Sequence, residues 1–298
     1  MITYLQALIL GLVQGVTELF PISSLGHSVI IAWLFNWHGI LASQSDSESF
    51  FLSFLVVLHV ACGTALLLFY RATWWRIAKG FFGTVKTRKL DSPDGRLAWM
   101  LIVGTIPAGI VGLTFEHALR TQFAKPLSAI IFLFVNGCIL LIGDRYLKHT
   151  VKARQSRLAV TSATNVHVSN TLTFTRAALI GTTQIGAFFA GISRSGITMV
   201  SGLYSGLSHE DAARFSFLLA TPIIFGAGLV KLPDFFSNLD AGVRGQILLG
   251  GVAAGVAAYA AVRYLDNYFR DKTLRPFGWY CIGISVAMLL LGVIRGHF

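Results

Sequence analysis

Two stretches of the chain match each other about 170 residues apart, and each interrupts an apolar run with a polar cluster. The first is ILGLVQGVTELFPISSLGHS from Ile9, and the second is LIGTTQIGAFFAGISRSGIT from Leu179. In register, the identical pairs are Gly11 with Gly181, Gln14 with Gln184, Ile22 with Ile192, Ser23 with Ser193 and Gly26 with Gly196. Polar groups are costly in hydrocarbon. Two such stretches at equivalent places in two halves therefore predict one shared site at the membrane midplane.

Composition places the chain in a membrane. Of its 298 residues, 54% are hydrophobic and 12% are charged, whereas a soluble domain carries roughly 25% charged residues. The apolar runs are helical in length rather than alternating barrel strands of about 10 residues, which predicts an all-α integral membrane protein. A net charge of +11 lies in short loops, so it indicates topology and anionic headgroups, and no nucleic acid partner is expected.

Six runs are long enough to cross a bilayer, at 50–70, 97–115, 126–143, 213–231, 246–263 and 277–294. Two further apolar stretches, 4–32 and 174–207, carry the broken motifs. Lys and Arg gather in the intervening loops 71–96, 144–176 and 264–276, whereas 33–49 has neither. The three basic loops are expected on the cytoplasmic side.

This sidedness dictates the topology. With the basic loops on the cytoplasmic side, the six crossings are consistent only if 4–32 enters and leaves on the outer side and 174–207 enters and leaves on the inner side. Both stretches are therefore expected to be re-entrant helix–break–helix hairpins. Each hairpin is followed by three crossings, and an odd number of crossings turns the second unit over. The prediction is an inverted-topology repeat with units 1–149 and 174–298, a mobile cytoplasmic linker at 150–173, and both termini outside.

The first hairpin offers a carboxylate, hydroxyls and a histidine. Gln14 and Glu18 are four residues apart and share a helix face. Pro21 then interrupts the helix, and Ser23 and Ser24 are good N-cap residues for a second short helix. His27 comes three residues after Ser24 and lies on the same face.

The second hairpin offers a guanidinium. Gly191 breaks the helix, Ser193 is placed to cap the next helical segment, and Arg194 precedes Thr198 by four residues. Each break presents backbone N–H groups and the positive end of a helix dipole. Tips entering from opposite sides would meet and form a polyanion site. Phosphate or diphosphate fits it better than a carboxylate, because Arg gives bidentate contacts.

Glu18 is the only acid deep in an apolar segment, and it would repel a bound diphosphate. Its presence is explained if it pairs with Arg194, holds a divalent cation or acts as a base. Ser24 is a nucleophile if Glu18 or His27 takes its proton; the alternative is direct attack by water, with Ser24 only a hydrogen-bond donor. A purely structural ion pair and simple helix caps are the plainer interpretations. His59 is interpreted as structural, and Gln184 as a tie to a neighbouring helix.

QGVTELFPISSLGH and GISRSGIT closely resemble the two signature motifs of the bacterial undecaprenyl-diphosphate phosphatases, the family linked to bacitracin resistance. The resemblance covers essentially the whole chain. It implies a multi-pass enzyme of the bacterial cytoplasmic (inner) membrane that hydrolyses undecaprenyl diphosphate and so recycles the lipid carrier of cell-wall synthesis. It also implies a divalent cation, Mg or Ca, with Glu18 as a ligand. A homodimer is compatible with it.

Carried over by the resemblance, the catalytic residues are Glu18, Ser24, His27 and Arg194. The substrate-binding residues around them are Gln14, Ser23, Ser193, Ser195, Gly196 and Thr198. The sequence departs from the family pattern at Gln14, where many members have Glu, at Ala190, which replaces Pro, and at Leu25, which replaces Thr. The first departure removes a second carboxylate that could bind a metal.

Two other classes of function are compatible with the pattern. Inverted repeats with broken helices also build secondary transporters, so a transporter or flippase of an anionic polyprenyl-phosphate lipid is the main alternative. A non-catalytic scaffold is the third. A hydroxyl, a carboxylate and a histidine within ten residues favour the phosphatase, because a transporter needs only binding groups.

Overall fold

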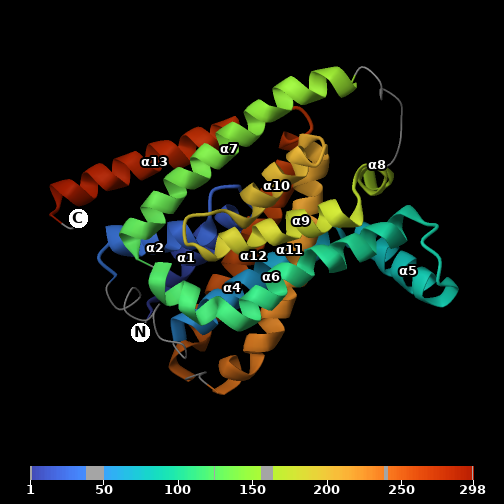
Figure 1. Ribbon diagram of the computed structural model, residues 1–298. Coiled ribbons are helices and arrows are strands. Elements are labelled where there is room, and N and C mark those ends of the chain that lie inside the picture. The colour runs from blue at the N-terminus through green and yellow to red at the C-terminus, as the bar shows by residue number, and fades with distance from the viewer. Residues whose placement is uncertain (1, 38–49, 124, 156–163, 238–240, 297) are drawn as a thin grey trace.

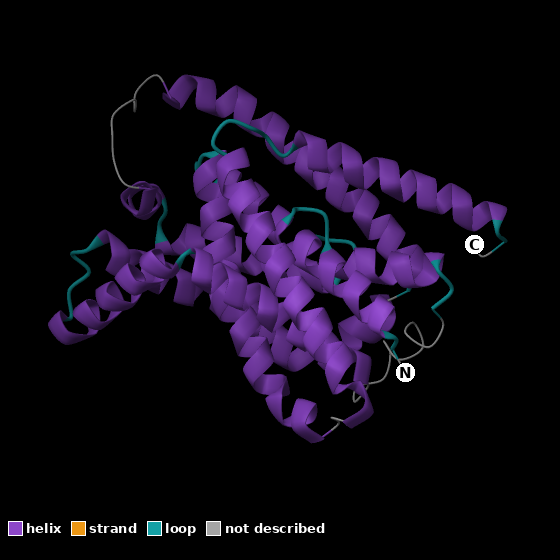
Figure 2. Cartoon of the chain, turned by 180° about the vertical axis from the view of Figure 1, so that it is seen from behind, coloured by secondary structure: helices purple, strands orange, loops and turns teal. Residues whose placement is uncertain are grey.

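The computed structural model describes residues 2–37, 50–123, 125–155, 164–237, 241–296 and 298, and every regular element in these ranges is a helix (Figure 2). The elements are α1 (Tyr4–Leu19), α2 (Ser24–Leu34), α4 (Phe50–Phe69), α5 (Arg71–Thr87), α6 (Pro93–Phe123), α7 (Pro126–Gln155), α8 (Thr164–Thr171), α9 (Phe174–Thr183), the 3₁₀ turn η1 (Gln184–Phe188), α10 (Arg194–Tyr204), α11 (His209–Ser237), η2 (Ala241–Val243), α12 (Arg244–Tyr268) and α13 (Arg275–Ile294).

The multi-pass membrane prediction is confirmed. In the described residues, five helices are long and apolar enough to cross a bilayer: Pro93–Phe115, Pro126–Arg145, His209–Val230, Arg244–Tyr268 and Arg275–Ile294. A sixth is reached if the bent pair Phe54–Phe69 and Arg71–Thr87 counts as one span. The first predicted crossing, 50–70, corresponds to α4, the first arm of this pair.

Two segments predicted as connections contain helix. The basic stretch 71–96, predicted as a loop, holds α5, which turns from α4 by 83°. It packs on α6, buries Thr73, Ile77 and Thr84, and accepts at Thr84 Oγ1 a hydrogen bond of 2.9 Å from the Trp99 indole N–H of α6. A buried face at helical spacing explains why this polar stretch folds. The linker predicted at 150–173 is also partly helical, because α7 runs to Gln155 and α8 lies within it.

Both predicted helix breaks are present. α1 ends at Leu19 and α2 begins at Ser24, with Pro21 between them. In the second segment α9 ends at Thr183 and tightens into η1, and the chain then turns at Gly191, whose φ of +111° suits glycine. The second arm therefore starts at α10, as the Gly191 break predicted.

The first arm of each broken segment packs on a helix from the other half of the chain. Gly11 of α1 lies against the backbone of Gly250 in α12, and Gly181 of α9 lies against the backbone of Gly104 in α6. A Cβ at either glycine would overlap the facing carbonyl. Small residues of this kind allow helices in lipid to approach closely.

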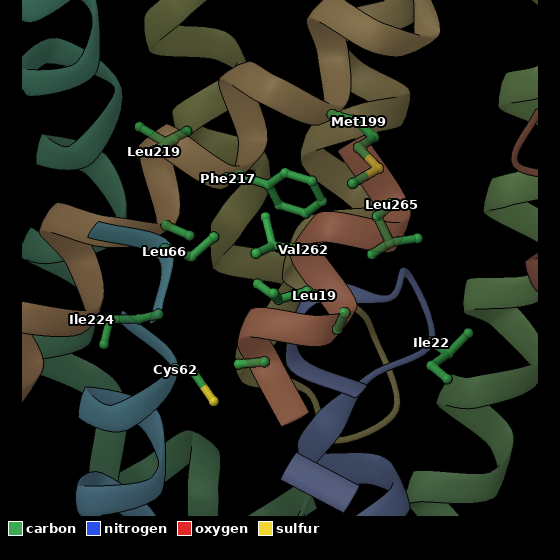
Figure 3. Packing of buried hydrophobic residues seen from close by; sticks show 14 of the residues in the cluster. Leu19, Ile22, Cys62, Leu66, Met199, Phe217, Leu219, Ile224, Val262 and Leu265 are labelled. Atoms are coloured by element: carbon green, nitrogen blue, oxygen red, sulfur yellow. The ribbon is translucent and has the colours of Figure 1, made fainter. Parts of the chain in front are cut away.

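The remaining helices lie around the α1–α12 and α6–α9 contacts. α7 and α13 pack along each other at one side of the molecule, and α5 and α8 lie at one end (Figure 1). Buried side chains from α1, α4, α10, α11 and α12 form one continuous core. Figure 3 shows it through Leu19, Cys62, Leu66, Met199, Phe217, Leu219, Ile224, Val262 and Leu265.

Candidate active site

The two helix breaks touch each other. Ser23 Oγ accepts hydrogen bonds from the Gly26 N–H at 3.2 Å and from the Gly191 N–H at 3.1 Å, so one hydroxyl serves both broken segments. In return, Ser195 Oγ donates to the Phe20 carbonyl at 3.2 Å. Ser23 itself has a φ of +71°, a sparsely populated conformation that persists only where the surroundings hold it. These contacts fix one break against the other.

Asn136 of α7 joins the same two breaks from a third helix. Its side-chain N–H donates to the Pro21 carbonyl at 3.0 Å, and its Oδ1 accepts from the Ser193 N–H at 2.9 Å. The side chain is fully buried. Both backbone groups lie where regular helical hydrogen bonding is interrupted, so Asn136 satisfies a buried acceptor and a buried donor at once.

A charged pair sits where the breaks meet. An Arg194 Nη2–H donates to Glu18 Oε1, and the Gln14 side-chain N–H donates to Glu18 Oε2 at 2.9 Å. Ser24 Oγ also donates to Oε2, at 2.7 Å. The carboxylate is thus held by groups from both segments, and a serine hydroxyl points its proton at it.

Arg194 pairs with Glu18 through only one of its two terminal nitrogens. Its Nη1 is buried and has no hydrogen-bond partner among the described groups, whereas Nη2 is paired with Glu18. α2 and α10 also begin here, with Ser23 and Ser193 as their N-caps, so two positive helix ends adjoin the guanidinium. An unsatisfied cationic donor beside two helix N-termini is an arrangement that binds anions, phosphate above all.

A cavity of about 450 Å³ opens onto this cluster. Its polar end is lined by Thr17, Glu18, Ser23, Ser24, His59, Thr105, Gln184, Ser193 and Arg194. The rest of its wall is apolar and glycine-rich, supplied mainly by α4, α6 and α11: Leu55, Val56, Ala108, Gly109, Gly112, Leu113, Phe188, Ile223, Ile224, Gly226 and Val230. The cavity therefore suits an amphipathic ligand with an anionic head and an apolar tail.

Of the residues proposed for the site, Glu18, Ser23, Ser24, Ser193 and Arg194 line the cavity. The others lie behind it.

Behind the cavity, Gln14 orients Glu18. Ser195 bonds to Phe20, and Thr198 Oγ1 lies 2.6 Å from Ser216 Oγ on α11. Gly196 is at the start of α10, where its N–H donates to Ser193 Oγ. Their predicted contact with substrate stays a prediction. Gln184 donates to the Gly104 carbonyl at 3.3 Å, which confirms the predicted tie to a neighbouring helix.

His27 does not face the cavity. Its Nδ1 is 2.7 Å from the Ser23 carbonyl, and because a carbonyl only accepts, this nitrogen carries a hydrogen. Its Nε2 lies 3.0 Å from the Tyr280 hydroxyl, and the two rings stack at 5.7 Å. The ring therefore braces the strained Ser23 against α13, and its predicted part in proton transfer stays a prediction.

Sequence reasoning missed two residues of this site. His59, interpreted as structural, lines the cavity with its Nε2 3.4 Å from Glu18 Oε2. Asn136 received no role at all. A signal was present in both cases, because each is an isolated polar side chain within a membrane helix, and such residues are rarely retained there without a task.

The side chains do not fit a resident metal ion. No three His, Cys, Asp or Glu side chains in the described part of the chain lie close enough together to hold one. Gln14 stands where a second carboxylate would help, and it points its N–H rather than its oxygen at Glu18. The carboxylate that was expected to bind the cation is already held by Arg194.

Fold and site together define an all-helical integral membrane protein with a buried cluster of Glu18, Ser24 and Arg194 at the meeting point of two broken helices. Residues 7–287 match the family model described as bacitracin resistance protein BacA. The chain is 48% identical to the undecaprenyl-diphosphatase of Mycolicibacterium paratuberculosis, over 99% of both chains. It is 45% identical to undecaprenyl-diphosphatase 2 of Frankia alni, over 94% of this chain and 95% of that protein. The chain belongs to the bacitracin resistance protein BacA family.

Proposed function

We propose that the protein hydrolyses undecaprenyl diphosphate to undecaprenyl phosphate and inorganic phosphate, and so returns the lipid carrier of bacterial cell-wall synthesis to use. The observation that carries the proposal is the pairing, in one cavity, of a serine hydroxyl that donates to a carboxylate with a buried guanidinium nitrogen that has no partner among the residues the structure describes. The names of the relatives, undecaprenyl-diphosphatases, agree with it.

The geometry supports a role for each group. The terminal phosphate is bound by Arg194 Nη1 and by the N-termini of α2 and α10, which stabilise charge on the transferring phosphoryl group. Ser24 Oγ attacks the terminal phosphorus while its proton passes to Glu18 Oε2, 2.7 Å away. The bond from that phosphorus to the bridging oxygen breaks, and its electron pair leaves with undecaprenyl phosphate. Glu18 passes this proton to the departing undecaprenyl phosphate. Water then attacks the phosphoserine: Glu18 takes a proton from the water and returns it to Ser24 Oγ as the serine–phosphorus bond breaks, and inorganic phosphate leaves.

The apolar wall supports the lipid half of the substrate. Gly109 of α6 and Gly226 of α11 line the cavity, and a Cβ built on either meets no atom within 4 Å. Apart from Glu18, His59 and Arg194, every residue that lines the cavity is uncharged. An isoprenoid chain is the kind of tail that such a wall accepts, and a water-soluble diphosphate would leave it unfilled.

The membrane arrangement is part of the proposal. We propose that α1–α2 and α9–α10 are re-entrant hairpins inserted from opposite sides, that units 1–149 and 174–298 are inverted repeats, and that both termini lie outside the cytoplasm. The exchanged packing supports this, since Gly11 and Gly181, equivalent in the duplicated motif, each meet a glycine on the second crossing of the other unit. A homodimer stays a prediction.

Labelling of single cysteines in intact cells tests the topology, in a background with Cys62, Cys138 and Cys281 replaced by alanine. An impermeant maleimide should label Thr3→Cys and Asn36→Cys on the two flanks of the first hairpin. It should not label Thr175→Cys, at the start of the second hairpin, until the cells are opened. Labelling of Thr3 and Asn36 from opposite sides would mean that α1–α2 crosses the bilayer.

The activity is tested by phosphate release from undecaprenyl diphosphate by the purified protein. Ser24→Ala, Glu18→Ala and Arg194→Ala should each lower the rate about a hundredfold or more, because each removes a group that acts in the transition state. Thr64→Val on the exposed face of α4 is the control for handling and folding.

The outcomes separate the alternatives. Wild-type rates in all three variants would remove the mechanism, and full activity in Ser24→Ala alone would point to direct attack by water. A wild-type protein that binds the lipid without releasing phosphate would be the transporter that the sequence also allows. The same assay with a chelator tests the divalent cation expected from the family resemblance.

A further inference from the structure

His59 of α4 is the one histidine among the cavity-lining residues. Its Nδ1 lies 2.8 Å from the Leu55 carbonyl one turn earlier, and because that carbonyl only accepts, Nδ1 carries a hydrogen. This bond directs Nε2 toward the cavity, where it lies 3.4 Å from Glu18 Oε2. The imidazole side chain is 35% exposed, although it sits inside an apolar helix.

Resting on the proposed function, we propose that His59, as an imidazolium with its second hydrogen on Nε2, is a positioning residue for Glu18 and holds the carboxylate with Oε2 toward the Ser24 hydroxyl. Glu18 is attached to its own segment by Gln14 and to the second segment by Arg194, on Oε1. His59 approaches Oε2 from a third element, α4. Three elements then fix the orientation of the acceptor of the serine proton.

Oε2 is the oxygen whose position governs the reaction. It accepts a hydrogen bond from Ser24 Oγ at 2.7 Å, whereas Arg194 donates to the other oxygen, Oε1. Gln14 also donates to Oε2, but from the same helix as Glu18, so His59 is the contact that restrains this oxygen from outside the first broken segment. Misplacing a reacting group by about 1 Å can cost roughly a hundredfold in rate, so a group that restrains Oε2 has a large effect without touching the substrate.

Among the ionisable side chains that line the cavity, His59 is the one that faces Oε2 of Glu18. Glu18, Arg194 and His59 are the only ionisable side chains among the residues that line the cavity. The family pattern would assign the histidine of the site to His27. In this chain, however, the two nitrogens of His27 face Ser23 and Tyr280, and neither is directed at Glu18.

The first experiment compares His59→Ala, His59→Gln and Thr64→Val in the phosphate-release assay. Glutamine keeps a side-chain N–H at about the reach of the imidazole Nε2, and alanine does not. Thr64→Val is a matched control, because Thr64 Oγ1 bonds to the Val60 carbonyl one turn earlier on α4 at 2.8 Å, as His59 Nδ1 does to Leu55. It removes the same kind of bond from the exposed face.

His59→Ala should lower kcat about tenfold or more with KM within about twofold, since the substrate-binding donors remain. His59→Gln should recover most of the loss, and Thr64→Val should match the wild type. An unchanged kcat in His59→Ala overturns the proposal. So does a His59→Gln variant as slow as His59→Ala, because a restraining N–H would then not be what matters.

A second measurement needs no turnover. His59→Ala should lower the thermal unfolding midpoint in the wild-type background and change it much less in a Glu18→Gln background, which would show that the two side chains interact. Equal shifts in both backgrounds overturn the proposal. If the wild type releases no phosphate, the proposed function fails, and this cycle still decides whether His59 is coupled to Glu18.

Discussion

Asn136→Leu should loosen the junction between the two broken helices. Leucine has the same number and branching of side-chain heavy atoms as asparagine but cannot bond to the Pro21 carbonyl at 3.0 Å or to the Ser193 N–H at 2.9 Å. The site is fully buried, so both backbone groups lose their partner without gaining water. Each unsatisfied buried group costs about 1–3 kcal/mol, which gives a destabilisation of about 2–6 kcal/mol.

The assay is thermal unfolding of the purified protein in detergent, measured for the wild type, Asn136→Leu and Asn136→Asp. At roughly 2–4 °C per kcal/mol, the midpoint of Asn136→Leu should fall by about 4 °C or more. Asn136→Asp keeps an acceptor for Ser193 but turns a second acceptor toward the Pro21 carbonyl, so its midpoint should also fall.

Thr64→Val, on the exposed face of α4, is the control and should stay within about 0.5 kcal/mol of the wild type. Phosphate release should fall together with stability in Asn136→Leu, because Glu18 and Arg194 come from the two segments that Asn136 joins. A wild-type midpoint and wild-type activity in Asn136→Leu would refute the reasoning.

Close helix packing, the guanidinium and the cavity wall can each be tested by substitution. Gly15→Leu should lower both the amount of protein extracted in detergent and its thermal unfolding midpoint, because the leucine side chain would overlap the backbone of α12. Arg194→Lys should stay far below the wild type in phosphate release, since an ammonium group cannot reach Glu18 and a phosphate with the same planar fork; wild-type turnover would show that charge alone suffices. Gly109→Leu and Gly226→Leu, which fill open space in the cavity, should raise KM for a long polyprenyl diphosphate more than for a short one, and equal changes would place the tail elsewhere.

Much of the site could be predicted because its signals are local. Pro21 and Gly191 are helix breakers, and the serines after them are caps, so both breaks and the starts of α2 and α10 result from short-range chemistry. Pairing with Arg194 is one of the three explanations that the sequence allows for Glu18, and the contact follows if the two broken segments meet at their tips.

The missed features depend on which helices become neighbours. His59 has no polar residue near it in sequence, and it meets Glu18 only because α4 packs against α1. Asn136 likewise bonds to groups 115 and 57 residues away. α5 was missed for a different reason. Its basic residues are typical of a cytoplasmic loop, and the face that it buries exists only because α6 and α11 pack against it.

The exchanged positions of α1 and α9 mean that neither half of the chain is a self-sufficient protein. Cutting it between the halves would strip α12 of α1 and α6 of α9, which leaves a glycine-lined seam bare in each fragment. A single ancestral unit of this design would have faced the same problem. If the two units are inverted repeats, as proposed above, such a unit could bury this seam only against a second copy inserted into the bilayer the other way round.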